Sequence, residues 1–212
     1  MRILIAPDKF KGSMTAREAS DAIRDALPKD WEAICLPIAD GGEGTSEALT
    51  DALSGEWVNC NVRDPLGRIV DSGYGLVVGP PKTAILEMSH ASGLWRLQSN
   101  ELDPWHASTF GTGELICDAV RRGAKRILLG LGGSATNDGG SGMAKALGVR
   151  FLDGDGTEVE SIPGDLAKVR RIDRSERLEL PEFSAACDVS NLLLGMEGAS
   201  RVYGPQKGVS ES

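Results

Sequence analysis

Two strand–turn–helix units in succession open the chain, and they constrain its fold more than any other feature. The apolar run at residues 2–6 leads to Asp8, and a helical pattern follows at residues 15–27. A second apolar run, residues 32–38, leads through an acidic, glycine-rich turn into a helix expected at residues 46–53. Such units form a parallel βαβ arrangement, which places both turns at the same edge of a sheet.

The residues of these two turns are candidate binding groups, because ligands of open α/β sheets sit beyond the carboxyl ends of the strands. The first turn offers Asp8, Lys9 and Lys11, and the second offers Asp40, Gly41, Gly42 and Glu43. For the first turn, a solvated loop with a charge pair would fit the same spacing equally well.

A third glycine-rich turn, residues 130–142, follows the apolar run 126–129 and reads G-L-G-G-S-A-T-N-D-G-G-S-G. A strand that runs into glycines and small hydroxyls before a helix is typical of a phosphate-binding loop, because glycine lets backbone N–H groups approach an anion. A plain turn between packed elements is slightly less favoured, since the run is dense and also carries amide and carboxylate groups. The candidate binding residues are Gly132, Gly133, Ser134, Thr136, Asn137 and Asp138.

From residue 57 onward, short strands joined by turns replace the strand–helix alternation, which indicates antiparallel pairing and a domain boundary near residue 58. A helical pattern returns at residues 108–122, with Leu115, Ala119 and Val120 expected in the core. Thr112 stands between two glycines at the start of this helix, where it could face an anion. An ordinary helix start explains these residues equally well.

The later part of the chain predicts a helix at residues 141–147 and a strand at 150–152. The run D-G-D-G at residues 153–156 lacks the spaced ligands of a calcium-binding EF-hand loop, so we interpret it as a hairpin turn. Residues 168–182 are expected to form a charged surface segment, and residues 184–189 a buried strand that delivers Asp188 at its end.

Composition excludes several classes of protein. The formal net charge of −8 over 212 residues disfavours general binding to nucleic acid or to anionic membranes. The four cysteines lie far apart and the chain has only two histidines, which argues against a zinc site and for reduced cytosolic thiols. No apolar stretch approaches the length of a membrane span, so we expect a cytoplasmic protein.

The chemistry that these parts favour is phosphoryl transfer. Glycine-rich donors, lysines and carboxylates position a phosphoryl group and neutralise its charge, whereas no histidine or G-x-S-x-G pattern supports acyl transfer. The chain has neither a Walker A lysine motif nor a protein-kinase signature, and it has no Rossmann G-x-G-x-x-G. The residues alone therefore predict a phosphotransferase of unfamiliar type.

Six motifs in order along the chain resemble the bacterial glycerate kinase family of the two-domain α/β type. They are A-P-D-K-F-K-G-S (6–13), A-D-G-G-E-G-T (39–45), F-G-T-G-E-L-I (110–116), G-L-G-G-S-A-T-N-D-G-G (130–140), C-D-V (187–189) and G-P-Q-K-G (204–208). The resemblance implies a Rossmann-like parallel-sheet domain, represented by residues 1–58, and a second mixed α/β domain, residues 59–212. It further implies ATP- and Mg²⁺-dependent phosphorylation of D-glycerate to 2-phosphoglycerate in the cytoplasm, with a homodimer as a candidate assembly.

Residue roles follow from the loop chemistry together with this resemblance. Asp188 or Asp8 would orient or deprotonate the glycerate hydroxyl, and Lys9 and Lys207 would contact the phosphate or the glycerate carboxylate. Asp138 and Asp40 are the candidate Mg²⁺ ligands. A non-catalytic relative that binds a nucleotide or an acid, and a kinase for another small hydroxy acid, are the alternatives.

The sequence departs from the family pattern at three points. His90 stands where the family usually has a small residue, and Leu192 replaces a usual proline. Family members also continue well beyond G-P-Q-K-G with segments that complete the first domain, so we expect a chain that lacks its C-terminal part. Residues 1–58 would then expose an unpaired sheet edge and an apolar face.

Overall fold

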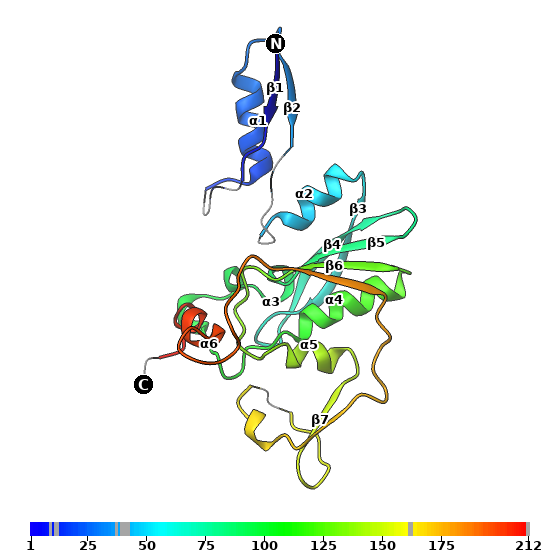
Figure 1. Ribbon diagram of the computed structural model, residues 1–212, viewed down its shortest axis with the longest axis vertical. Helices are drawn as coiled ribbons and strands as arrows, with labels where there is room; N and C mark the ends of the chain where they lie inside the picture. Colours follow the sequence, from blue (N-terminus) through cyan, green and yellow to red (C-terminus); the bar gives the residue numbers. More distant parts are fainter. Residues whose placement is uncertain (9, 11–12, 37, 39–42, 161–162, 211–212) are drawn as a thin grey trace.

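The computed structural model describes residues 1–8, 10, 13–36, 38, 43–160 and 163–210. Five predicted site residues lie outside this described part: Lys9, Lys11, Asp40, Gly41 and Gly42. The architecture is mixed α/β, as predicted, with a parallel pair of strands at the N-terminus and a larger mixed sheet that forms the body of the molecule (Figure 1). None of the helices in the described part has both the length and the apolar character of a membrane span.

The N-terminal unit consists of β1 (Arg2–Ile5), α1 (Ala16–Ala26) and β2 (Glu32–Cys35). The two strands pair in parallel, which confirms the predicted βαβ arrangement. Thr15 and Glu18 form a capping box at the start of α1: the Thr15 side chain accepts from the Glu18 N–H at 3.1 Å, and the Glu18 carboxylate accepts from the Thr15 N–H at 2.8 Å. The helix therefore begins where the sequence predicts it.

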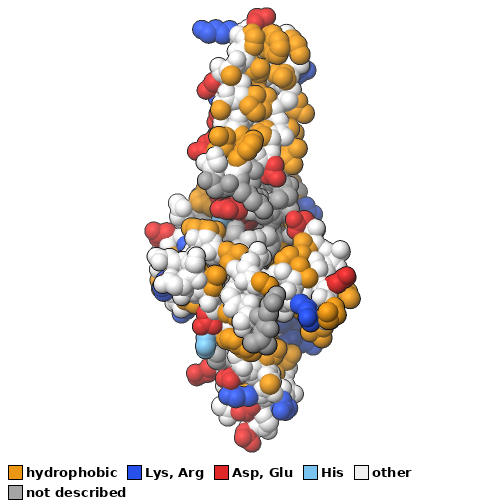
Figure 2. All heavy atoms as spheres, turned by 90° about the vertical axis from the view of Figure 1, so that its left-hand side faces the viewer, with side chains coloured by type: hydrophobic (Ala, Val, Ile, Leu, Met, Phe, Trp, Pro, Cys, Tyr) orange, Lys and Arg blue, Asp and Glu red, His pale blue; other side chains and the backbone are white. Residues whose placement is uncertain are grey.

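This unit stands apart from the rest of the chain in Figure 1, and much of its apolar surface is uncovered. Figure 2 shows hydrophobic side chains along its length. The exposed apolar residues of its strands and the segment after them are Leu4, Ile34, Leu36 and Ile38. The exposed apolar face expected for the first 58 residues is thus present.

The body is built on a five-stranded sheet in the order β3-β4-β5-β6-β9. β3, β4 and β5 pair antiparallel, as predicted, whereas β5, β6 and β9 run parallel. The strands are β3 (Glu56–Arg63), β4 (Ile69–Val77), β5 (Thr83–Glu87), β6 (Arg126–Gly130) and β9 (Glu182–Ala186).

Helices cover both faces of this sheet (Figure 1). α2 (Thr45–Ala52) contacts β4 and β5 on one face, and α4 (Phe110–Arg121) packs on the other, where it also contacts α5 (Ser141–Ala146). Leu115 and Ala119 of α4 are fully buried, as predicted, and Val120 is partly buried. The domain division near residue 58 stays a prediction, since α2 precedes it and yet packs on the larger sheet.

Short elements complete the chain. The segment 92–104 includes two 3₁₀ helices, and a small strand lies within the charged stretch 168–182. At the D-G-D-G turn, the Asp153 carboxylate accepts from the N–H groups of Asp155 and Thr157, which confirms a hairpin turn. The remaining elements are α3 (Ser89–Ser92), β7 (Arg150–Leu152), β8 (Arg171–Asp173), α6 (Ala199–Tyr203) and 3₁₀ helices at Leu94–Arg96, Ser99–Glu101, Leu166–Lys168 and Pro205–Lys207.

The prediction that the strand before Asp188 is buried is wrong. β9 is the outer strand of the sheet, and most of its residues are exposed. Within the described part of the chain its extensive contacts are with β6 alone, because no helix covers it there. Asp188 follows this strand and is itself exposed.

Candidate functional site

The parallel part of the sheet brings two predicted segments, together with α3, to one edge. Glu87, Gly130 and Ala186 are the last residues of β5, β6 and β9, and they lie opposite one another in the strand register. The chain beyond them forms α3, the glycine-rich turn and the C-D-V segment. The carboxyl ends of parallel strands are the usual ligand-binding edge of an α/β sheet. The structure therefore supports a ligand site at this edge.

The glycine-rich turn is held against the segment that follows α3. The Leu94 N–H donates to the Gly133 carbonyl at 2.9 Å, and the Ala135 N–H donates to the Ser92 carbonyl at 2.8 Å. Gly133 has a φ of +73°, in the left-handed region that a residue with a side chain rarely adopts. Glycine at this position therefore sets the path of the turn between these two hydrogen bonds.

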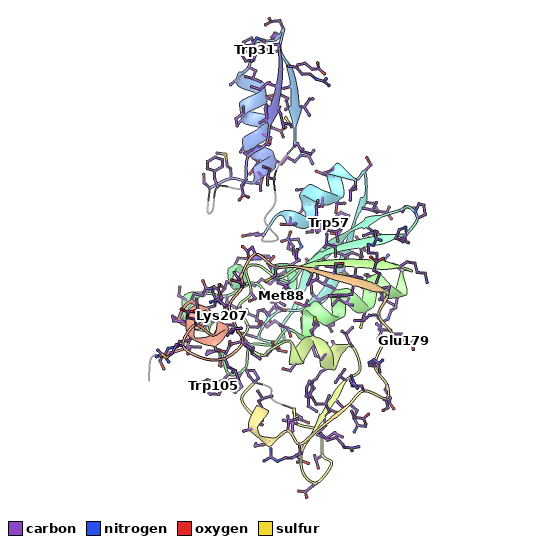
Figure 3. The ribbon with its side chains drawn as sticks, in the orientation of Figure 1. Trp31, Trp57, Met88, Trp105, Glu179 and Lys207 are labelled. Carbon is purple, nitrogen blue, oxygen red and sulfur yellow. The ribbon has the colours of Figure 1, made fainter. Side chains whose placement is uncertain are left out.

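Lys207 reaches this turn from the C-terminal part of the chain (Figure 3). Its ammonium donates to the Ser134 hydroxyl at 2.8 Å and to the Thr136 carbonyl at 2.7 Å. Lys207 is only 9% exposed, and burial lowers its pKa despite the opposing charge of Asp138. An ammonium has three hydrogens to donate, so an anion at this turn could accept the third.

Asp138 is 5% exposed, and both oxygens of its carboxylate are engaged. One oxygen accepts from the N–H and the hydroxyl of Thr109, at 2.8 and 2.7 Å, and from the N–H of Gly142 at 3.1 Å. The other accepts from the N–H of Gly140 at 3.0 Å. Asp138 thus links the starts of α4 and α5, and it occupies donors that a phosphate would otherwise use.

Two other predicted residues also have internal partners. Thr112 is fully buried, and its hydroxyl lies 2.9 Å from that of Ser92, so it faces the interior rather than a ligand. The Asn137 side-chain oxygen accepts from the Ser200 hydroxyl of α6 at 3.0 Å, which ties the turn to the C-terminal helix. Gly132 and Ser134 are partly exposed on the same turn.

The predicted residues of the N-terminal turns lie elsewhere. Asp8 and Glu43 line a cleft of about 1350 Å³ between the N-terminal unit and the face of the sheet that carries α2. Ser134, Thr136 and Lys207 are not among the described residues that line this cleft. The structure therefore places Asp8 and Glu43 at the cleft, and Ser134, Thr136 and Lys207 together at the glycine-rich turn.

Sequence reasoning missed Glu87, which is 1% exposed at the end of β5. Its carboxylate accepts from the N–H groups of Ser46 and Gly44, at 2.5 and 3.1 Å, and from the Ser89 hydroxyl at 3.0 Å. It therefore fixes the start of α2, directly after the second acidic turn. The available signal was an acidic residue that ends an otherwise apolar strand.

His90 lies beside Glu87 and also contacts Glu47 of α2. Its Nε2 is 3.2 Å from a Glu47 carboxylate oxygen and 3.6 Å from one of Glu87. Burial alone would lower the pKa of His90, but the hydrogen bond to Glu47 and the charges of both carboxylates raise it above its usual value. The sequence singled out His90 only as a departure from a family pattern.

Comparison with known proteins relates this chain to one family. A model described as the glycerate kinase family matches residues 3–212. The chain is 46% identical over 217 residues to a glycerate kinase of Halalkalibacterium halodurans, and 45% identical over 219 residues to the glycerate 2-kinase of Escherichia coli. These alignments cover 99% and 100% of this chain and 57% of each relative.

A solved structure agrees with these relatives. The crystal structure of a Salmonella typhimurium LT2 protein assigned as glycerate kinase 2 superposes with a TM-score of 0.87 at 44% identity. The match covers 100% of this chain and 58% of that one. The chain therefore spans less than three fifths of the length of the proteins it matches.

Proposed function

The chain belongs to the glycerate kinase family, and on that premise we propose that the protein phosphorylates D-glycerate with ATP and Mg²⁺, giving 2-phosphoglycerate. The observation that carries this proposal is the Lys207 ammonium, which lies on the glycine-rich turn at the ligand-binding edge of the sheet. A buried ammonium beside the Ser134 hydroxyl suits a phosphate, because charge stabilisation supplies most of the catalysis in phosphoryl transfer.

The chain's own residues suggest a division of roles. Lys207 and Ser134 would hold the phosphate at the turn, and Asp8 or Asp188 would orient the glycerate hydroxyl or accept its proton. Mg²⁺ would neutralise charge on the nucleotide, and exposed carboxylates such as Glu43 suit it better than the engaged carboxylate of Asp138. Lys9, Lys11 and Asp40 keep their predicted roles as part of this proposal.

The setting of the reaction is part of the same proposal. Four free cysteines fit a reducing cytoplasm, and D-glycerate is the expected partner molecule. Residues 1–58 would belong to a Rossmann-like domain and residues 59–212 to a second domain, and a homodimer is the assembly to test by size-exclusion chromatography with light scattering.

An ADP-release assay with D-glycerate tests the activity, with Lys207→Met as the central variant. Removing one preorganised charge from a phosphoryl-transfer site lowers kcat by about 10²–10³-fold, so we expect a loss of that order. Lys168→Met is the matched control, because Lys168 is an exposed lysine that pairs only with Asp165 in the described structure. Equal turnover of the two variants would remove Lys207 from the mechanism.

A second pair of variants separates the candidate bases. General-base assistance contributes about 10²–10⁴-fold, so Asp188→Asn or Asp8→Asn should lower kcat by that factor if the residue takes the proton.

The two alternative functions predict different results. ATP binding by calorimetry without ADP release would favour a non-catalytic binding protein, whereas turnover with a different acid in a substrate panel would identify another hydroxy-acid kinase.

A further inference from the structure

Three side chains, of which two are only three residues apart in the sequence, meet at the wall of the cleft. They are Glu47 of α2, Glu87 at the end of β5 and His90 of α3, and their potential ligand atoms all lie within 4.8 Å of one another. Each comes from a different element, and the packing of α2 brings Glu47 to the neighbouring pair Glu87 and His90. None of the three is needed for the phosphoryl transfer proposed above.

We propose that Glu47, Glu87 and His90 bind a divalent transition-metal ion of the zinc class. Zn²⁺ binds nitrogen and carboxylate oxygen at about 2.0–2.2 Å in tetrahedral sites, which places neighbouring ligand atoms about 3.3–3.6 Å apart. The Nε2 atom of His90 lies 3.2 Å from the Glu47 oxygen and 3.6 Å from the Glu87 oxygen. Two of the three ligand pairs are thus already close to the required spacing, and the Glu47 and Glu87 oxygens lie within 4.8 Å of each other.

The outer contacts of the ligands also fit a metal site. The Nδ1 atom of His90 lies 3.3 Å from the Gly73 carbonyl, which can accept the Nδ1 proton and leave the Nε2 lone pair facing the carboxylates. The Trp57 ring packs edge-on against the imidazole with centroids 5.5 Å apart, and it limits rotation of the ring. Metal-binding histidines commonly use such a carbonyl partner to fix their tautomer.

The charge of the cluster calls for a cation. Glu87 is nearly inaccessible, and of the partners that the structure describes for it only His90 can carry a positive charge. Two carboxylates and one imidazole would hold a dication without leaving an excess of positive charge, and the dication would compensate the buried charge of Glu87.

Access and ligand type point to the class of ion. The Glu47 side chain is 50% exposed and lines the cleft, so an ion can enter there and keep a water as its fourth ligand. A mixed nitrogen and oxygen set suits Zn²⁺, Mn²⁺ or Fe²⁺, whereas Mg²⁺ prefers six oxygens. The site is therefore chemically distinct from that of the Mg²⁺ expected with ATP.

Isothermal titration calorimetry of the metal-free 212-residue chain with Zn²⁺ tests the proposal, and the chain offers a matched control. Of its two histidines, His106 is exposed and pairs with Asp103. We expect one saturable site in the wild type and in His106→Ala, and at least about 100-fold weaker binding in His90→Ala. Glu47→Gln should weaken binding at least about tenfold, because it removes one anionic ligand.

Two further measurements distinguish this site from metal binding at the thiols. All variants keep the four free cysteines, so Zn²⁺ binding that is equal in wild type and His90→Ala would be thiol or adventitious binding and would overturn the proposal. Co²⁺ should give the visible absorption of a four-coordinate ion without sulfur charge-transfer bands, and only where His90 is present. Circular dichroism must show that His90→Ala remains folded; if it does not, Glu47→Gln decides, and unchanged affinity there also overturns the site.

Discussion

Asp138 carries a negative charge into a nearly closed part of the molecule, where its partners are backbone N–H groups and one hydroxyl. It accepts from Thr109, Gly140 and Gly142, and these residues belong to the starts of two helices. A carboxylate at a helix start is stabilised by the free N–H groups and by the helix dipole. The residue predicted to hold Mg²⁺ therefore has an evident structural role, which stability measurements can isolate.

We expect Asp138→Asn to lower the free energy of unfolding by about 2–4 kcal/mol, because an amide cannot accept the same set of hydrogen bonds and carries no charge. Urea denaturation followed by circular dichroism measures this loss as a lower midpoint. Asp155→Asn is the matched control, since Asp155 is an exposed aspartate in a hairpin turn and should change stability by less than about 0.5 kcal/mol. Equal midpoints for the two variants would contradict the structural role.

At the scale of elements, α4 and α5 approach closely because α4 carries glycine at the contact. A Cβ atom on Gly113 would lie 2.6 Å from both the Ala146 Cβ and the Met143 carbonyl oxygen of α5. Sequence reasoning considered Gly113 as part of an anion-binding helix start, and the structure gives it a packing function instead. The glycine pattern alone does not separate these roles, because both require a backbone without a side chain.

Gly113→Ala should therefore push the two helices apart and lower the free energy of unfolding by about 1–3 kcal/mol, despite the better helix propensity of alanine. Thermal unfolding measures the change. Gly154→Ala provides the control, because a Cβ there meets no atom within 4 Å and Gly154 needs no left-handed conformation. A melting temperature of Gly113→Ala at or above that of the control would show that the helices can adjust freely.

The elements that the sequence predicted well are those with local signals. The helical pattern at residues 15–27 placed α1, and the apolar run before Gly130 placed β6. Burial was harder to predict, since β9 looks like a core strand and yet lies at the sheet edge without a covering helix. The burial of a strand depends on its neighbours, which its own residues do not specify.

The predictions for the candidate site differ in the same way, between residues that belong to a sequence motif and residues that do not. Lys207 and Ser134 were each identified from a motif. They are 73 residues apart in the sequence, and in the structure the Lys207 ammonium donates to the Ser134 hydroxyl at 2.8 Å. Glu47, Glu87 and His90 were missed as a cluster because Glu47 is remote in the sequence from the other two, and the scarcity of histidine and the absence of a C-x-x-C pair argued against a zinc site. Only the packing of α2 on β5 reveals that one histidine meets two glutamates.

At the scale of the whole molecule, the sheet body and the N-terminal unit differ in how much apolar core they bury. The sheet body has helices on both faces and a continuous core that includes Tyr74, Leu86 and Ile127. In the N-terminal unit, by contrast, α1 covers only a two-stranded sheet, and Ile5 and Ala19 are the buried apolar residues that the structure describes there. An ion pair between Arg17 and Asp51 links this unit to α2 across the cleft.

Hydrogen exchange followed by mass spectrometry should detect this difference directly. Local opening costs least where few apolar contacts must be broken, so we expect amides of β1, α1 and β2 to exchange at least about 100-fold faster than those of β5, β6 and α4. Arg17→Ala tests the link between the two parts, although an exposed ion pair contributes only about 0–1 kcal/mol. We therefore expect it to change exchange in the N-terminal unit by less than about fivefold and to leave the sheet body unchanged. Equal protection of both parts in the wild type would mean that the N-terminal unit opens only together with the sheet body, and that its exposed apolar face is covered in solution.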